Sequence, residues 1–121
     1  MSNEIKNMKS LKERAREFSV SLPFMEGREK GDTKDLIGLV STITEYGFLP
    51  NDKGGRFAVF TVQERPKQFY FGGMVITDQL EQLDAEGYHD AIVNEGLPML
   101  MTEKKSKSGM KYTNVEFFPE N

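Results

Sequence analysis

Hydrophobic residues near the start of the chain recur at helical spacing. They lie three or four positions apart among Lys, Arg and Glu residues: Ile5, Met8, Leu11, Ala15 and Phe18. This spacing predicts an amphipathic helix. A helix this short is marginal alone in water, so it needs a surface to pack on, either its own domain or a neighbouring copy. Residues 19–34, which contain Pro23, Gly27 and Gly31, are typical of a linker.

From residue 35 onward the pattern is that of β-strands separated by turns. Residues 36–46 are rich in β-branched side chains and alternate between the two faces of a strand, and residues 56–65 form a second apolar run. Residues 68–76 form a third run, with Gly72-Gly73 indicating a bulge or a tight bend. A Gly-Gly pair also lies between the first two runs, where it predicts a turn.

Helical signals follow the third run, and two further strands follow the helix. Asp78 with Glu81 three positions on matches a capping box, which predicts a helix start at this point. Residues 97–103 and 111–118 read as strands on either side of the polar, basic stretch 104–110. This stretch is expected to be a hairpin tip.

The order of three strands, a helix and a two-stranded hairpin predicts a mainly β domain of the oligonucleotide/oligosaccharide-binding (OB) type, a five-stranded barrel with a helix between strands three and four. Other small β folds with an inserted helix have the same order. We expect two parts: residues 1–34 as an amphipathic helical arm and linker, and residues 35–121 as the OB-type domain.

Two stretches resemble bacterial and phage single-stranded DNA-binding proteins, in the small versions carried by phages or conjugative elements. Residues 68–83 (QFYFGGMVITDQLEQL) resemble their third strand running into the barrel helix. Residues 95–118 (EGLPMLMTEKKSKSGMKYTNVEFF) resemble their last hairpin, with a Gly turn, an apolar strand, a basic loop and an aromatic-led strand. The resemblance implies an OB fold, single-stranded DNA as partner, and a role in DNA replication, recombination or conjugation.

The composition narrows the chemistry. The 121 residues include no Cys and one His, His89, which excludes disulfides, thiolate catalysis and Cys-based zinc sites. We therefore expect no enzyme, no cofactor and no metal. Glu103 and Lys105 match the Glu-x-Lys of some metal-dependent nucleases, but a match of this length is common by chance. No run is long and apolar enough for a membrane span, and no secretory signal is evident, so a cytoplasmic location is expected.

The charges are segregated along the chain. The net charge is −3, which by itself argues against binding phosphates. Residues 78–95 hold acids and no Lys or Arg: Asp78, Glu81, Asp84, Glu86, Asp90 and Glu95. Residues 99–112 hold Lys104, Lys105, Lys107 and Lys111 against the single acid Glu103. A chain with this distribution can present a positive surface on one side.

Aromatic residues next to cations are the candidate ligands for bases. Strand alternation assigns Phe60 inward and Phe57 outward, and it assigns Tyr70 and Tyr112 to exposed faces, opposite Phe71 and Val115. Aromatic residues in strands also serve as core, and lysines at a hairpin tip also serve solubility. The candidate DNA-binding residues are Tyr46, Phe48, Arg56, Phe57, Lys67, Tyr70, Lys104, Lys105, Lys107, Lys111 and Tyr112.

Together these patterns predict sequence-nonspecific binding of single-stranded DNA by aromatic stacking and phosphate contacts. A homo-oligomer, assembled through the N-terminal arm, is expected to accompany it. The alternative is an OB-type protein-interaction module that binds no nucleic acid, because a fold of this kind does not fix function.

Overall fold

The computed structural model describes residues 22–120. The helical stripe predicted between Ile5 and Phe18 lies outside the described residues. In chain order the elements, with η for a 3-10 helix, are η1 (Pro23–Met25), β1 (Glu29–Lys30), η2 (Thr33–Leu36), β2 (Val40–Pro50), β3 (Arg56–Val62), β4 (Gln68–Phe71), α2 (Met74–Ala85), α3 (His89–Glu95), β5 (Leu97–Lys105) and β6 (Lys111–Phe117). The described domain is mainly β, with helical structure between β4 and β5, as the sequence predicts, and this region holds two α-helices where one was expected.

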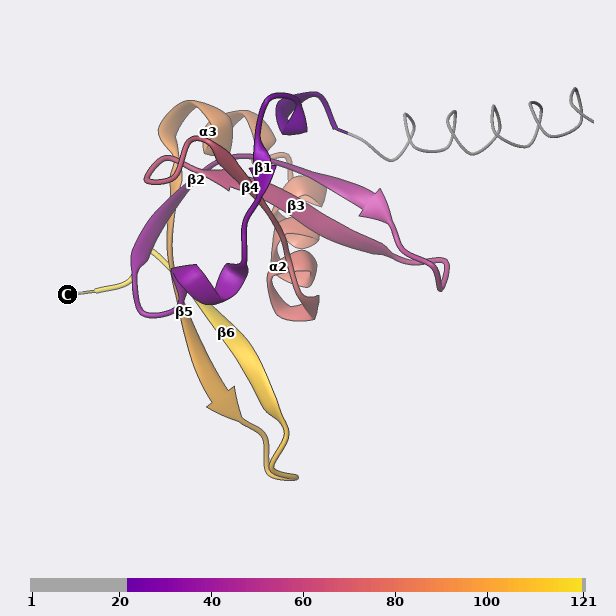
Figure 1. Cartoon of the computed structure of the whole chain (residues 1–121), viewed down its shortest axis with the longest axis vertical. Coiled ribbons are helices and arrows are strands. Elements are labelled where there is room, and N and C mark those ends of the chain that lie inside the picture. The colour runs from indigo at the N-terminus through magenta and orange to yellow at the C-terminus, as the bar shows by residue number, and fades with distance from the viewer. Residues whose placement is uncertain (1–21, 121) are drawn as a thin grey trace, which may run out of the picture.

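The strands form one six-stranded sheet in the order β1-β4-β3-β2-β5-β6. β1 pairs parallel with β4, and the other neighbours are antiparallel. β2 is the longest strand and pairs with β5 over its first residues and with β3 over the rest. The β2–β3 and β5–β6 hairpins project from the body in different directions (Figure 1).

The expectation of a closed five-stranded barrel is wrong. Among the described residues β4 and β6 do not pair, so the sheet is open, and it has a sixth strand, β1. The cause lies at the end of β4. At Gly72 a Cβ atom would lie 2.6 Å from Cγ2 of Ile76, so the glycine lets the chain fold back tightly into α2. β4 stops at Phe71, before it could reach β6.

Helix α2 begins earlier than the capping box predicted. Its N-cap is Gly73, with no side-chain cap, and Asp78 lies within the helix. Ile76, Leu80 and Leu83 are spaced by four and three residues, so they share the helix face that packs on the sheet. This apolar spacing, rather than the Asp78–Glu81 pair, sets the helix boundaries.

The core lies between the sheet and α2. Phe60 and Tyr70 are opposite each other in the β3–β4 register, both are fully buried, and their rings stack with centroids 5.6 Å apart. Leu36 of η2 is also buried in this core. Val59 and Thr61, on the other face of β3, are buried too, so the expectation that only one face of this strand is covered is wrong.

Residues 22–34, predicted as part of a linker, belong to the domain. β1 pairs with β4 through Glu29 opposite Gln68 and Lys30 opposite Phe69. The Leu22 side chain lies against Gly47, whose register partner on β3 is Val59. The segment thus adds a strand at one edge of the sheet and helps to cover the sheet face that points away from α2.

Candidate nucleic-acid interface

Three phenylalanines gather on the sheet face that points away from the core. Phe71 is the register partner of Val59, so it points opposite to Phe60 and Tyr70. The ring centroids of Phe57 and Phe71 are 4.9 Å apart, and those of Phe69 and Phe71 are 5.7 Å apart. All three rings remain partly exposed. We call Phe57, Phe69 and Phe71 the aromatic face.

A cation accompanies the aromatic face. The Lys30 ammonium lies 4.6 Å from the centroid of the Phe71 ring, within the range of a cation–π contact. Lys30 is exposed and lies on β1, beside Phe69 in the parallel register. The pairing of β1 with β4 therefore places a positive charge at the edge of a flat apolar surface.

Sequence reasoning missed Phe69, Phe71 and Lys30. Successive side chains of a strand point to alternate faces, so the three consecutive aromatic residues 69–71 place two rings on one face and one ring on the other. This pattern could have identified Phe69 and Phe71 as a pair on one face. Tyr70 was assigned outward because of its hydroxyl. Lys30 was missed because the segment that holds it was predicted as a linker.

Tyr70 is not a surface residue, so its predicted exposure is wrong. Its ring is fully buried, and its hydroxyl donates to Oε1 of Gln68 over 2.8 Å. Burial raises the pKa of this phenol. The hydroxyl thus finds a partner on its own strand, two residues away, and needs no water to satisfy it.

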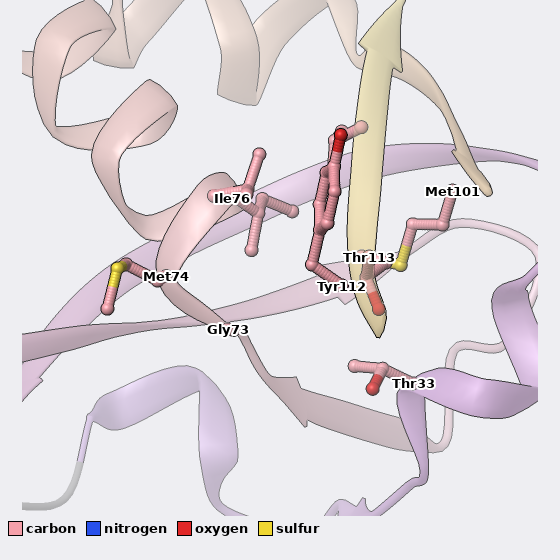
Figure 2. Close-up of a pocket in the computed structure, with 9 residues that line it drawn as sticks. Thr33, Gly73, Met74, Ile76, Met101, Tyr112 and Thr113 are labelled. Atoms are coloured by element: carbon pink, nitrogen blue, oxygen red, sulfur yellow. The ribbon is translucent and has the colours of Figure 1, made fainter. Parts of the chain in front are cut away.

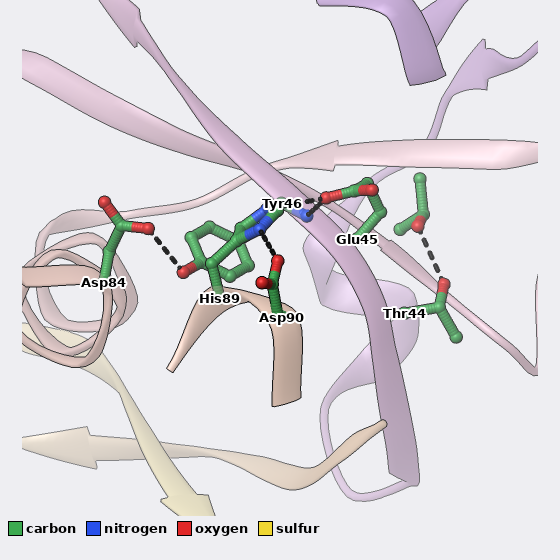
Figure 3. A network of polar contacts seen from close by, with 7 residues as sticks. Thr44, Glu45, Tyr46, Asp84, His89 and Asp90 are labelled. Atoms are coloured by element: carbon green, nitrogen blue, oxygen red, sulfur yellow. Dashed lines mark hydrogen bonds and ion pairs between the residues drawn. The ribbon is translucent and has the colours of Figure 1, made fainter. Parts of the chain in front are cut away.

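Tyr46 is also buried, with its side chain 3% exposed. Its hydroxyl donates to Oδ1 of Asp84 on α2 over 2.7 Å, and its ring meets the His89 ring edge-on with centroids 4.8 Å apart (Figure 3). Burial, and then the hydrogen bond to Asp84, raise the pKa of Tyr46. Tyr46 therefore connects β2 with α2 through this hydrogen bond, and because it is buried it is not accessible to a ligand.

The same network joins β2 to α3. Nε2 of His89 lies 3.1 Å from Oε1 of Glu45, and its Nδ1 lies 3.7 Å from Oδ1 of Asp90 (Figure 3). Both helices are thereby fixed to neighbouring residues of one strand. Within residues 22–120 no cluster of His, Cys, Asp and Glu could hold a metal ion.

Arg56 and Phe48 lie away from the aromatic face. The Arg56 guanidinium lies 4.5 Å from the centroid of the Phe48 ring, and its Nε lies 3.5 Å from Oε1 of Glu81 on α2. Phe48 packs partly against the core. Both residues thus belong to the helix side of the sheet, whereas Phe57 points to the opposite side.

The β5–β6 hairpin presents the predicted lysines. Lys104, Lys105, Lys107 and Lys111 are all exposed, as is Lys67 in the turn before β4. In the hairpin register Lys104 is opposite Tyr112, and Lys105 is opposite Lys111. Tyr112 is 42% exposed, which confirms its predicted exposure. We call Lys104, Lys105, Lys107 and Lys111 the basic hairpin.

A nuclease site built on the Glu-x-Lys match needs a second acid on a strand next to Glu103. Glu103 is opposite Thr113 on the exposed hairpin, whereas the candidate acids Asp90 and Glu95 lie on α3.

In the part of the chain that the structure describes, no helix is long and apolar enough to cross a membrane.

The structure therefore brings together Phe57 with Phe69, Phe71 and Lys30, and it brings together Tyr112 with the basic hairpin. It separates Tyr46, Phe48, Arg56 and Tyr70 from both groups. In comparisons with known proteins, no family model, curated protein or solved structure matches this chain.

Proposed function

We propose that this chain binds single-stranded DNA without sequence preference, with bases stacked on the aromatic face and phosphates held by the basic hairpin and Lys30. The observation that carries the proposal is the aromatic face, where three partly exposed rings lie within 5.7 Å of a neighbour and beside a lysine. Stacking of a base on an aromatic ring contributes about 1–3 kcal/mol and tolerates any sequence, because every base has a flat face.

We also propose that the sheet is an opened OB-type fold. The order β4-β3-β2-β5-β6 has the neighbours expected for such a barrel, except that its last closing pair is missing, and the helices lie between β4 and β5. In OB domains the oligonucleotide crosses strands two and three and is contacted by the loops between strands one and two and between strands four and five. If the sheet is of this type, the aromatic face, on β3 and β4, corresponds to strands two and three, and the basic hairpin corresponds to the loop between strands four and five.

The charge distribution supports this assignment despite the net charge of −3. The acids of residues 78–95 lie on α2, on α3 and between them, whereas the lysines lie on the β5–β6 hairpin. Figure 1 shows α3 and the tip of this hairpin at opposite ends of the molecule. An anionic strand can therefore approach the hairpin without passing close to the acids of α3, and the interaction will be weakened by salt.

The proposal is tested by fluorescence anisotropy. A labelled oligo-dT of about 30 nucleotides, longer than the about 4–16 nucleotides that one OB fold covers, and a matching duplex are titrated at about 50 mM and about 200 mM salt. We expect binding of the single strand, tighter at the lower salt, and weaker binding of the duplex, whose bases are not free to stack. Absence of binding to the single strand at low salt would refute the proposal.

A second candidate function is a protein-interaction module, and one observation favours it. A hollow of about 230 Å³ between α3 and the C-terminal residues is lined by Leu83, Ile92 and Leu97, and its rim carries Tyr88 and Phe118, which are 49% and 66% exposed. Exposed apolar groups around a hollow suit a protein partner. If the oligonucleotide does not bind, this surface becomes the site to test.

A further inference from the structure

A second hollow opens where the sheet fails to close. It has a volume of about 260 Å³ and lies between the start of α2 and strand β6. Met74 and Ile76 line it from the helix, and Tyr112 and Thr113 line it from β6 (Figure 2). None of Phe57, Phe69 and Phe71 lines it, so it is distinct from the aromatic face.

We call this hollow, lined by Met74, Ile76, Tyr112 and Thr113, the seam pocket. Its rim exposes two side chains suited to a flat ligand. Met74 is 81% exposed and Tyr112 is 42% exposed. Figure 2 shows the Tyr112 ring standing beside Ile76, with Met74 on the helix side of the opening. A phenol ring offers a stacking surface, and a methionine thioether is polarisable and adapts to ring edges. The Thr33 and Thr113 side chains add hydroxyl groups to the lining.

The surroundings of the pocket indicate an anionic ligand that continues in two directions. On one side lies the basic hairpin, with Lys104 directly opposite Tyr112 in the register. On the other side Thr33 is shared with an adjoining hollow that is lined by Lys30 and Phe71 of the proposed interface and by Asp32, whose Oδ1 accepts a hydrogen bond from the Lys34 amide. Thr33 thus lies between the hollow beside the aromatic face and the seam pocket, which Tyr112 lines.

We propose that the seam pocket receives one base of the bound single strand, stacked on Tyr112, while the neighbouring phosphates contact Lys104 and Lys111. This inference rests on the proposed function and adds a subsite to it. A nucleobase fits the requirements because it is flat and carries polar edges for the threonine hydroxyls, and the backbone that holds it is negatively charged. The strand would then be held at two separate places, the aromatic face and the seam pocket.

The chain contains no Trp, so a single Trp can report on the pocket. In the full-length Tyr112→Trp variant we expect oligo-dT to quench Trp emission, with the same midpoint as the anisotropy of the labelled oligonucleotide. The matched control is Tyr88→Trp, which is similarly exposed but lines the other hollow, and its emission should stay unchanged. Circular dichroism and thermal unfolding verify that both variants are folded.

The outcomes separate the subsite from the function. Binding by anisotropy without quenching at position 112, or with equal quenching at both positions, would overturn the subsite and leave the proposed function standing. No binding by the unmodified protein would overturn both. A change of Trp emission on dilution without DNA would show that a second copy fills the pocket, which would also overturn the subsite.

A second pair of variants tests the pocket rim without altering an aromatic residue. Met74→Ala should weaken binding of oligo-dT about twofold to tenfold, the range of a sulfur–aromatic contact. Met110→Ala removes the same side chain from the hairpin tip, where Met110 is 69% exposed and lines no part of the pocket, and it should leave the affinity unchanged. Equal affinities for the two variants would count against a base in the pocket.

Discussion

Gly31 lies directly over the ring of Tyr70. A Cβ atom at this position would approach Cε1 of Tyr70 to 2.5 Å and Cδ of Gln68 to 3.2 Å. The ring is held in place by its stacking on Phe60 and by its hydrogen bond to Gln68, so it cannot move aside easily. The contact requires glycine at the end of β1.

We expect Gly31→Ala to lower the free energy of unfolding by about 1–3 kcal/mol, the usual cost of overpacking. The control is Gly73→Ala, where no heavy atom lies within 4 Å of the added Cβ and the loss should be smaller, about 0.5 kcal/mol, because Ala is a poorer N-cap. Urea denaturation measures both variants. Equal losses would show that Tyr70 is free to shift.

Tyr46 makes stability depend on pH in the alkaline range. Because burial and Asp84 raise its pKa above the ordinary 10.0, the folded chain keeps the phenol protonated at a pH where the unfolded chain releases the proton. The contribution is therefore complete below about pH 10 and declines as the pH rises beyond it, toward the folded-state pKa.

Tyr46→Phe removes the titrating group and its hydrogen bond, at a cost of about 1 kcal/mol near neutral pH. Urea denaturation of both proteins between about pH 7 and about pH 10.5 measures the difference. We expect the advantage of the unmodified protein to be constant up to about pH 10 and to shrink above it. An advantage that grows with pH would contradict the assignment.

Whether an aromatic residue is core or surface could be predicted at some positions and not at others. Tyr112 could be placed because Val115 and Phe117 mark the opposite, apolar face of its strand. At residues 69–71 every side chain is aromatic, so hydrophobicity gives no preference between faces. The outcome depends on the register with β3, where Tyr70 meets Phe60, and on Gln68 as a local partner for the hydroxyl.

At the scale of single elements, β3 and β4 carry the proposed stacking surface. Phe57→Leu combined with Phe71→Leu preserves much of the packing but removes two flat rings. We expect the affinity for oligo-dT to fall about tenfold or more at every salt concentration, with an unchanged salt slope, because no charge is lost. The control is Leu39→Ala with Val40→Ala. It removes two apolar side chains that are 51% and 49% exposed and lie outside the aromatic face, so it should leave the affinity unchanged.

The basic hairpin carries the proposed phosphate contacts. Lys104→Ala with Lys105→Ala should flatten the plot of log affinity against log salt by about 1.4, since each contact with a single strand contributes about 0.7. Ser108→Ala with Met110→Ala alters the same exposed tip without changing its charge and should leave the slope unchanged. Anisotropy titrations at several salt concentrations measure the slopes, and equal slopes would place the phosphates elsewhere.

The elements themselves followed from local patterns except where a glycine pair had two interpretations. The strands β2, β3, β5 and β6 were expected close to their observed positions, and a single helix was expected in the region where α2 and α3 lie. Gly72-Gly73 was taken as a bulge or a tight bend within a strand that runs to residue 76, whereas β4 ends at Phe71 and Gly73 is the N-cap of α2. The distinction depends on the packing of Ile76 against Gly72 and Ala58, which brings together residues distant in sequence.

At the scale of the whole molecule, residues 22–36 belong to the fold, so the position of an N-terminal truncation matters. Deletion of residues 1–34 removes β1 and Gly31, and we expect thermal unfolding at a clearly lower temperature. Deletion of residues 1–21 leaves every described contact in place and should preserve the unfolding temperature. If both deletions behave alike, β1 contributes little to stability.

The same shorter deletion tests the proposed role of the N-terminal segment in self-association. We expect analytical ultracentrifugation to show a smaller assembly, or weaker association, when residues 1–21 are removed, because the predicted apolar stripe from Ile5 to Phe18 would be lost. A change confined to the larger deletion would assign association to the sheet edge at β1.

The strand order of the sheet could be inferred from the element order, but its closure could not. Whether the last strand meets β4 depends on the length of β4, which has four residues. The pairing of β1 with β4 could not be predicted from the sequence either, because a strand of two residues is too short to show an alternating pattern. Both features are set by contacts between distant parts of the chain.

The divided pairing of β2 has a consequence for how the protein is made. β2 meets β3 from Ile43 onward and meets β5 only over Val40–Ile43, with a register shift between Ile43 and Glu45. Strands β2, β3 and β4 form a meander, β1 pairs parallel with β4, and all four strands lie within residues 22–71, so they are synthesised before β5 and β6. At about 5–20 residues per second, a few seconds separate the synthesis of β4 from that of β6, and during this interval β2 lacks its partner β5.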